Sequence, residues 1–179
     1  KFLNQLMFYD KNLPVAQFDP HMANGLVYKG EEKISKIGFG VSASIELFKK
    51  ALISGCQALI VHHAFNFPSG VKYDFLFQGR YSHLLKNNLS LFGYHFLLDS
   101  HPEIGHNVLI IEKLKGEVEK PFIHAGAPWG YFGTVNNLSI DQVKNIFAKD
   151  FSPNMIIYPF GPKEIKRVVA ISGRGTPNP

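Results

Sequence analysis

Metal-binding residue types follow two apolar segments of the chain, each at the point where the segment ends. The segments are residues 57–61 and 89–94. The histidines and the aspartate that follow them are His62, His63, His95 and Asp99. A short apolar run between turn residues is typical of a buried strand in an α/β sheet, and ligands of such sheets bind beyond the carboxyl ends of the strands. Because imidazole and carboxylate are ligands of divalent transition metals, the sequence predicts one metal site formed by both strand ends.

The adjacent pair His62 and His63 leaves two interpretations open. The chain has eight histidines, so the pair alone slightly favours a surface loop or packed rings with satisfied nitrogens. Its position at a strand end favours the metal site. Consecutive strand residues point to opposite sides, so the two rings would supply one imidazole to each of two ions more easily than they would grip one ion. Asp99 would then bridge the ions, as in two-metal sites with ions about 3.5–4 Å apart.

His95 and Asp99 are four residues apart, which places both on one side of a helix or a strand. Only a helical or turn-like arrangement would bring both within reach of one ion. We expect His95 to be a ligand or to orient the ligands, the alternative being a strand-end histidine bonded to the backbone. The nearby His101 and His106 are expected to be solvated loop residues. The sequence indicates no partner for the other histidines, which are His21, His83 and His124.

A further motif, Ser172–Gly175, follows a predicted strand. Its backbone amides and Arg174 would suit a phosphate, but without a following helix a plain turn is the favoured interpretation. No Ser-His-Asp or Cys-His arrangement for nucleophilic catalysis stands out, and no full nucleotide-binding fingerprint is present.

The length and composition suit one sizeable core or two small ones, and we expect a single α/β metal-binding domain over residues 1–179. The chain is 45% hydrophobic and only 18% charged, so we expect exposed apolar surface that would be buried in a homo-oligomer. The net charge of +5 is spread along the chain without basic runs, which leaves a nucleic-acid partner unsupported. The single cysteine, Cys56, excludes an internal disulfide, falls where a core residue is expected, and favours a cytoplasmic setting. No apolar stretch has the length of a membrane-spanning helix.

Periodicity predicts an α/β fold of mixed sheets with flanking helices. An amphipathic helix over residues 44–54, ended by Gly55, stands between strands at 36–41 and 57–61, which is a parallel crossover unit. The capping box at residues 139–142 predicts the start of another helix. The remaining predictions are the end of a helix at 1–9, a loop at 10–20, helices through 81–87 and 107–115, and strands at 26–28, 129–135 (with a bend or bulge), 155–158 and 168–172. The chain stops just after the last strand, so it is expected to be the front part of a longer protein.

Several short motifs occur in an order that resembles the NIF-three-like dinuclear-metal family, whose members are often named GTP cyclohydrolase I type 2 homologues. The motifs are Asn24-Gly-Leu26, Ile60-Val-His-His63 with Ala64 where the family has proline, His95-Phe-Leu-Leu-Asp99 with Phe96 where the family has threonine, Gly105-His-Asn107 for Gly-Val-Asn, Gly130-Tyr-Phe-Gly133, and the segment Val168–Gly175. Together they extend over nearly the whole chain.

The resemblance implies that His62, His63 and Asp99 are metal ligands and that His95 lies at the site. It implies two divalent ions per complete chain, of zinc, iron, manganese or a similar metal. A His and a Glu, four residues apart, would come from a C-terminal segment that this sequence lacks. It also implies toroidal hexamers with the metal sites facing an internal cavity.

Three functional hypotheses follow. The leading one is a metal-dependent hydrolase of a GTP-cyclohydrolase-like or phosphoester type, acting on a nucleotide or another small molecule. The alternative is a non-enzymatic, metal-containing oligomeric scaffold or regulatory protein that binds partners, because no residue is clearly shaped to bind a substrate. The third is nucleic-acid binding by the basic assembly. No membrane partner is expected.

Overall fold

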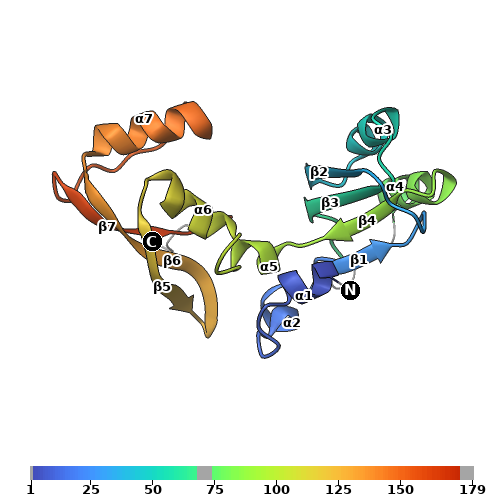
Figure 1. Ribbon diagram of the computed structural model, residues 1–179, viewed down its shortest axis with the longest axis horizontal. Coiled ribbons are helices and arrows are strands. Elements are labelled where there is room, and N and C mark those ends of the chain that lie inside the picture. Colours follow the sequence, from blue (N-terminus) through green and yellow to red (C-terminus); the bar gives the residue numbers. More distant parts are fainter. Residues whose placement is uncertain (1, 68–73, 174–179) are drawn as a thin grey trace. The chain divides into compact units, whose positions relative to one another are not determined.

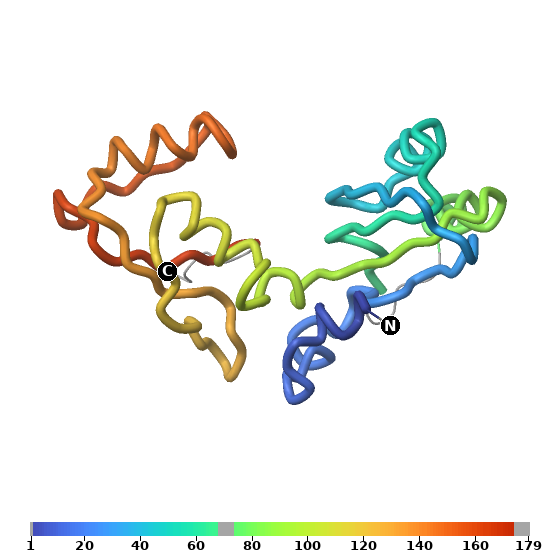
Figure 2. The backbone as a smooth tube through the Cα atoms, viewed as in Figure 1, coloured from blue at the N-terminus to red at the C-terminus, as the bar shows by residue number. Residues whose placement is uncertain are grey.

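A computed structural model describes residues 2–67 and 74–173 (Figure 1). The chain forms two compact units, residues 1–98 and 99–179, and each unit is built on its own sheet. Figure 2 follows the backbone through both units in chain order. The predicted α/β class, with mixed sheets and flanking helices, is confirmed. A single domain over residues 1–179 stays a prediction.

The first unit contains a four-stranded sheet in the order β1-β4-β3-β2. Its strands are β1 (Gly25–Tyr28), β2 (Ile37–Ser42), β3 (Ala58–His63) and β4 (Ser90–Gly93). β2, β3 and β4 are parallel to one another, whereas β1 is antiparallel to β4. The carboxyl ends of three strands therefore lie at one edge of this sheet.

Two helices connect the parallel strands. α3 (Ile45–Ile53) begins after Ser44, whose hydroxyl oxygen accepts a hydrogen bond from the Leu47 N–H, and it ends before Gly55, which has a φ of +74°. α4 (Phe75–Lys86) connects β3 to β4. The predicted crossover unit is therefore confirmed as β2-α3-β3.

Apolar side chains cover both faces of this sheet beside β3 and β4. The cluster on one face combines residues of α3 and α4 with residues of the strands and of the segments between them. It includes Phe48, Ala51, Cys56, Leu59, Val61, Phe65, Leu84, Leu89 and Leu91. The second cluster includes residues of α1 (Phe2–Met7) and α2 (Val15–Phe18) together with Ile60 and Phe92 of the strands. The core position of Cys56 is confirmed, and the predicted loop at 10–20 is corrected, because it contains the short helix α2.

The second unit contains a three-stranded antiparallel sheet in the order β5-β6-β7. Its strands are β5 (Glu117–His124), β6 (Ala127–Leu138) and β7 (Ile165–Ala170). The helices of this unit are α6 (His106–Lys113) and α7 (Ile140–Asp150). The short helix α5 (Phe96–Asp99) stands at the boundary, with its first three residues in the first unit. Buried residues of α6 pack on the sheet, where Val108 and Ile111 meet Tyr131 and Ala170.

Some expectations for this unit hold and others do not. The capping box at the start of α7 and the irregular pairing of β6 are both present. Residues 155–158 lie in neither sheet, so that strand prediction is wrong, and the last strand is shifted to 165–170. β5 was not predicted from the sequence, because three charged residues and Pro121 interrupt the alternation of apolar and polar residues. Within the described ranges, no helix is long and apolar enough to cross a membrane.

Gly93, the last residue of β4, packs too closely for a side chain. An added Cβ would lie 2.5 Å from the Cβ of Ala64 and 2.6 Å from the carbonyl oxygen of Ala23. We predict that Gly93→Ala lowers the free energy of unfolding by about 1–3 kcal/mol, as overpacking typically does. Gly161→Ala is the matched control, because nothing lies within 4 Å of its added Cβ. Chemical denaturation measures both, and equal stability of the two variants would contradict the close packing.

Candidate metal centre

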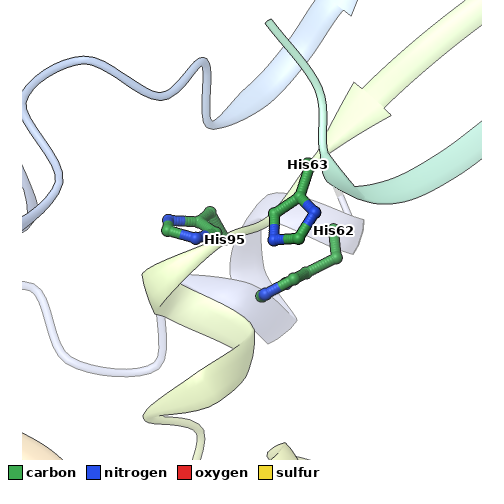
Figure 3. A group of neighbouring side chains, drawn as sticks. All are labelled: His62, His63 and His95. Atoms are coloured by element: carbon green, nitrogen blue, oxygen red, sulfur yellow. The ribbon is translucent and has the colours of Figure 1, made fainter. Parts of the chain in front are cut away.

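Three imidazoles of the first unit converge beyond the carboxyl ends of β3 and β4 (Figure 3). One ring nitrogen from each of His62, His63 and His95 lies within 4.8 Å of the other two, which suits a single ion. The ring centroids are 4.5 Å apart for His62 and His63, 4.8 Å for His62 and His95, and 5.3 Å for His63 and His95. The first unit therefore brings together three of the four predicted site residues.

Parallel pairing of β3 with β4 is what places these residues side by side. Val61 pairs with Gly93, and the Tyr94 N–H donates to the Val61 carbonyl at 3.0 Å. β3 continues through both histidines, beyond the predicted end at Val61, with β2 as its partner there. One nitrogen from each of the two rings belongs to the same group of three. That His62 and His63 supply one imidazole to each of two ions stays a prediction.

Hydrogen bonds at Nδ1 orient all three rings. The Nδ1 of His62 lies 3.0 Å from the carbonyl oxygen of Tyr94, and the Nδ1 of His95 lies 3.0 Å from Oδ1 of Asp19. Both partners accept only, so Nδ1 carries the proton and the lone pair of the neutral ring is on Nε2. The Nδ1 of His63 is bonded to the Ser42 hydroxyl at 3.1 Å. Histidines that bind metals have this arrangement, in which the other nitrogen is held by a carbonyl, carboxylate or hydroxyl.

Asp19 is the residue of this site that the sequence analysis missed. Its carboxylate accepts from the His95 ring, from the side chain of Asn24 at 2.7 Å, and from the Phe96 N–H at 3.3 Å. Asn24 in turn accepts from the His95 N–H at 3.0 Å. The partner of the His95 ring is therefore a carboxylate, which corrects the alternative of a histidine bonded to the backbone. No local pattern marks Asp19, whereas Asn24 stands in one of the family motifs.

The Asp19 carboxylate is held in its ionised form. Its side chain is only 8% exposed, and this burial by itself raises the pKa. The hydrogen bonds from His95 and Asn24, together with the attraction of His95 and the Phe96 N–H, outweigh burial and lower the pKa below its ordinary value. A buried anion thus lies directly behind one of the three imidazoles, which favours a cation in front of them.

Asp99, the fourth predicted site residue, is held within the second unit. Its Oδ1 accepts from the Ser172 hydroxyl at 2.6 Å and is bonded to the Nδ1 of His106 at 2.8 Å. Its carbonyl oxygen accepts from the side chain of Asn107 at 2.9 Å. The chain between His95 and Asp99 is helical, as α5, which is the arrangement that would be needed to bring both within reach of one ion. That Asp99 is a ligand alongside the histidines stays a prediction.

The structure corrects both expectations for the nearby histidines. His101 is 2% exposed instead of solvated, and its Nδ1 accepts from the N–H groups of Glu103 and Ile104. His106 is part of α6 and contacts Asp99, so it is not a solvated loop residue either. Ser172 donates to Asp99, while the proposed phosphate contact of Arg174 lies outside the described residues.

The donor set fits a divalent transition metal. Three imidazoles with their Nδ1 atoms anchored match the nitrogen ligands of zinc and related ions, and the buried carboxylate behind them adds the charge that such sites carry. Imidazole is a poor match for calcium or magnesium, which prefer oxygen ligands.

Comparison with known proteins identifies the family of this chain. The family model described as Duf34/NIF3 (NGG1p interacting factor 3) matches residues 3–177. The chain is 34% identical to "GTP cyclohydrolase 1 type 2 homolog" of Pyrococcus abyssi over 94% of this chain and 68% of that protein. It is 31% identical to the protein of the same name from Escherichia coli K12, over 97% and 69% of the two chains.

Solved structures show the same fold. A protein described as "Structural genomics, protein ybgI, unknown function" superposes with a TM-score of 0.81 and 25% identity, over 97% of this chain and 68% of that one. "Reduced HcgD from Methanocaldococcus jannaschii" superposes with a TM-score of 0.76 and 20% identity, over 97% and 67%. The chain therefore belongs to the Duf34/NIF3 family, and it spans about two thirds of the length of these relatives.

The ring tautomers give a direct test of this site. In the metal-free protein at mildly alkaline pH we predict that His62 and His95 carry the proton on Nδ1, because a carbonyl and a carboxylate accept there. Long-range nitrogen–proton correlation NMR assigns the tautomers. Asp19→Asn is expected to change the His95 signals and to leave those of His62 unchanged. Protons on Nε2 of both rings would show that the described orientation is wrong.

Proposed function

We propose that the protein is a metal-dependent hydrolase whose centre is dinuclear and is held by His62, His63 and Asp99, with His95 as a ligand or positioning residue. The convergence of three imidazoles, each anchored at Nδ1, is the observation that supports this proposal most. The family membership adds support, because the matched relatives are named GTP cyclohydrolase 1 type 2 homologues. The substrate class would be a nucleotide or another phosphoester.

The residues of this chain have distinct roles in the proposed centre. His62 and His63 would present neutral imidazole nitrogens, and Asp19 would keep His95 in the tautomer that faces the ions. Ser172 and His106 would hold the Asp99 carboxylate in one orientation. Zinc, iron, manganese or a similar ion would act there as a Lewis acid and would make water nucleophilic near neutral pH.

Assembly is a further part of the proposal. We infer that the protein forms homo-oligomers in the cytoplasm, with the toroidal hexamer of the resembled family as the expected form. Large apolar side chains are exposed in both units, among them Phe39 and Val41 on β2 and Ile156 and Phe160 after α7. Patches of this kind mark surfaces that are covered in an assembly. The same observation favours the alternative function, a metal-containing scaffold or regulatory protein that binds partners.

The metal content of variants distinguishes residues that bind the metal from residues that do not. We predict that the protein binds divalent metal and that His63→Ala loses most of it, because a nitrogen donor is removed. Asp19→Asn is expected to lower the affinity about 10–100-fold, as loss of a partner behind a ligand typically does. Elemental analysis and competition with a chelator measure both. His124→Ala, an exposed histidine at the end of β5, is the control that should bind like the wild type. Equal metal content in all four proteins would overturn the site.

Turnover decides between the enzyme and the scaffold. We predict that the metal-loaded protein hydrolyses at least one member of a panel of nucleotides and phosphoesters. Asp99→Ala is expected to abolish turnover while the mass in solution stays that of the wild type. Metal binding without turnover of any panel member would reject the hydrolase and leave the scaffold.

A further inference from the structure

Arg80 of α4 contacts the two chain segments that flank His63. Its Nη1 donates to the carbonyl oxygen of Ala43 at 3.2 Å, and its Cζ lies 5.2 Å from the ring centroid of Phe65. Ala43 follows Ser42, the last residue of β2, and Phe65 is two residues beyond the end of β3. A single guanidinium therefore joins the end of β2 to the segment that follows β3.

This arginine is partly withdrawn from water. Its side chain is half-buried, its Nε atom is buried, and both of its neighbours, Ala43 and Phe65, are at most 3% exposed. A hydrogen bond from a cation to a carbonyl oxygen is stronger than a bond between neutral groups, and poor access of water strengthens it further. The bond from Arg80 to Ala43 is thus suited to fix the backbone at this point.

The end of β2 is also what orients the His63 ring. Ser42 pairs with His63 across the parallel ladder, and its hydroxyl is bonded to Nδ1 of the ring at 3.1 Å. The next residue, Ala43, donates its N–H to the His63 carbonyl at 2.8 Å. Ala43 is therefore held from two sides, by His63 at its N–H and by Arg80 at its carbonyl.

The partner of His63 is less constrained than the partners of the other two rings. The Nδ1 atoms of His62 and His95 face a carbonyl and a carboxylate, which only accept. The Ser42 hydroxyl can rotate and can donate or accept, and the Ser42 side chain is exposed. Its place therefore depends on the backbone of β2, which is at the edge of the four-stranded sheet.

We propose that Arg80 is a positioning residue for His63. It fixes the end of β2 through the Ala43 carbonyl, and the fixed strand end holds the Ser42 hydroxyl against the His63 ring. This rests on the metal centre of the proposed function and adds a residue that acts through the backbone of a neighbouring strand. Groups behind a metal-binding imidazole set its orientation and thereby the affinity for the ion.

Zinc affinity tests this role. Arg80→Met keeps an unbranched apolar side chain over Phe65 and removes the donor to Ala43. We expect it to lower the affinity for zinc about tenfold, as loss of a group that orients a ligand does. Lys86→Met, at an exposed position at the end of the same helix, is the matched control and should bind zinc like the wild type. Competition with a chelator measures the affinities, and an unchanged affinity of folded Arg80→Met would overturn the proposal.

A double-mutant cycle shows whether Arg80 acts through Ser42. Ser42→Ala removes the hydroxyl and is also expected to lower the zinc affinity about tenfold. The variant with both substitutions should lose about tenfold and not about a hundredfold, because both break the same series of contacts. Losses that multiply would show that Arg80 acts independently of Ser42 and would overturn the proposal.

Nuclear magnetic resonance of the metal-free protein gives a readout that a general loss of packing would not produce. At mildly alkaline pH, the ring nitrogen signals of His63 are expected to move in the same direction in Arg80→Met and in Ser42→Ala. The signals of His62 and His95 should stay, because their partners lie outside β2. Equal changes at all three rings would indicate loosened packing and contradict a role specific to His63.

Arg80→Lys is the second variant and disturbs the fold less, since it keeps the charge and one donor. A lysine lacks the planar fork of the guanidinium, so its bond to Ala43 is expected to be weaker. The zinc affinity should fall between those of the wild type and Arg80→Met, and the His63 signals should move the same way by a smaller amount. Unchanged His63 signals in this variant would overturn the proposal even if Arg80→Met does not fold, which circular dichroism decides.

The two kinds of measurement separate this inference from the metal centre on which it rests. A wild type that binds no zinc would overturn the proposed metal centre. The His63 signals are recorded without metal, so they still decide whether Arg80 positions that ring.

Discussion

The parallel pairing of β3 with β4 is the constraint on which the candidate metal centre depends. Two hydrogen bonds join the ends of these strands, one donated from each side. The Tyr94 N–H donates to the Val61 carbonyl, and the His62 ring donates to the Tyr94 carbonyl. His95 follows Tyr94 directly, so its ring centroid is carried to 4.8 Å from that of His62. The site is thus built on a rigid sheet edge, with apolar clusters on both faces to hold it.

A buried carboxylate makes this edge suitable for a cation. Asp19 is the residue at which α2 ends, and its neighbour Phe18 packs on Phe96 with the ring centroids 5.9 Å apart. That contact holds Asp19 against the turn after β4, where His95, Asn24 and the Phe96 N–H supply its hydrogen bonds. Because these donors outweigh the effect of burial, the carboxylate is ionised, and its negative charge lies behind the imidazoles. The short helix α2 therefore has a role in the site that its length does not suggest.

The second unit also contains a carboxylate that is held by an imidazole, with different residues. The Asp99 carboxylate is bonded to Ser172, which follows β7, and to His106, which begins α6. Asn107 ties the two regions together, because it donates to the Asp99 carbonyl and accepts from the Ser172 N–H. In both units a carboxylate is oriented by an imidazole and a second donor. In the same unit, residues 155–158 keep the strand character of their sequence without a partner strand in the described chain.

The sequence by itself determined the elements and the strand-end positions of the site residues. Apolar runs, the Ser44 cap, Gly55 and the Ser139 capping box are patterns within a few residues, so β3, α3 and α7 follow from local spacing. Local spacing failed where charge hid an alternation, as in β5, and where a strand-prone run found no partner, as at 155–158. The tertiary structure alone decided the partners of the imidazoles and of Asp99. Asp19 is 76 residues from His95, Ser42 is 21 from His63, and Ser172 is 73 from Asp99. Such pairs depend on how strands and helices pack, and no pattern along the chain specifies which distant carboxylate or hydroxyl a ring will face.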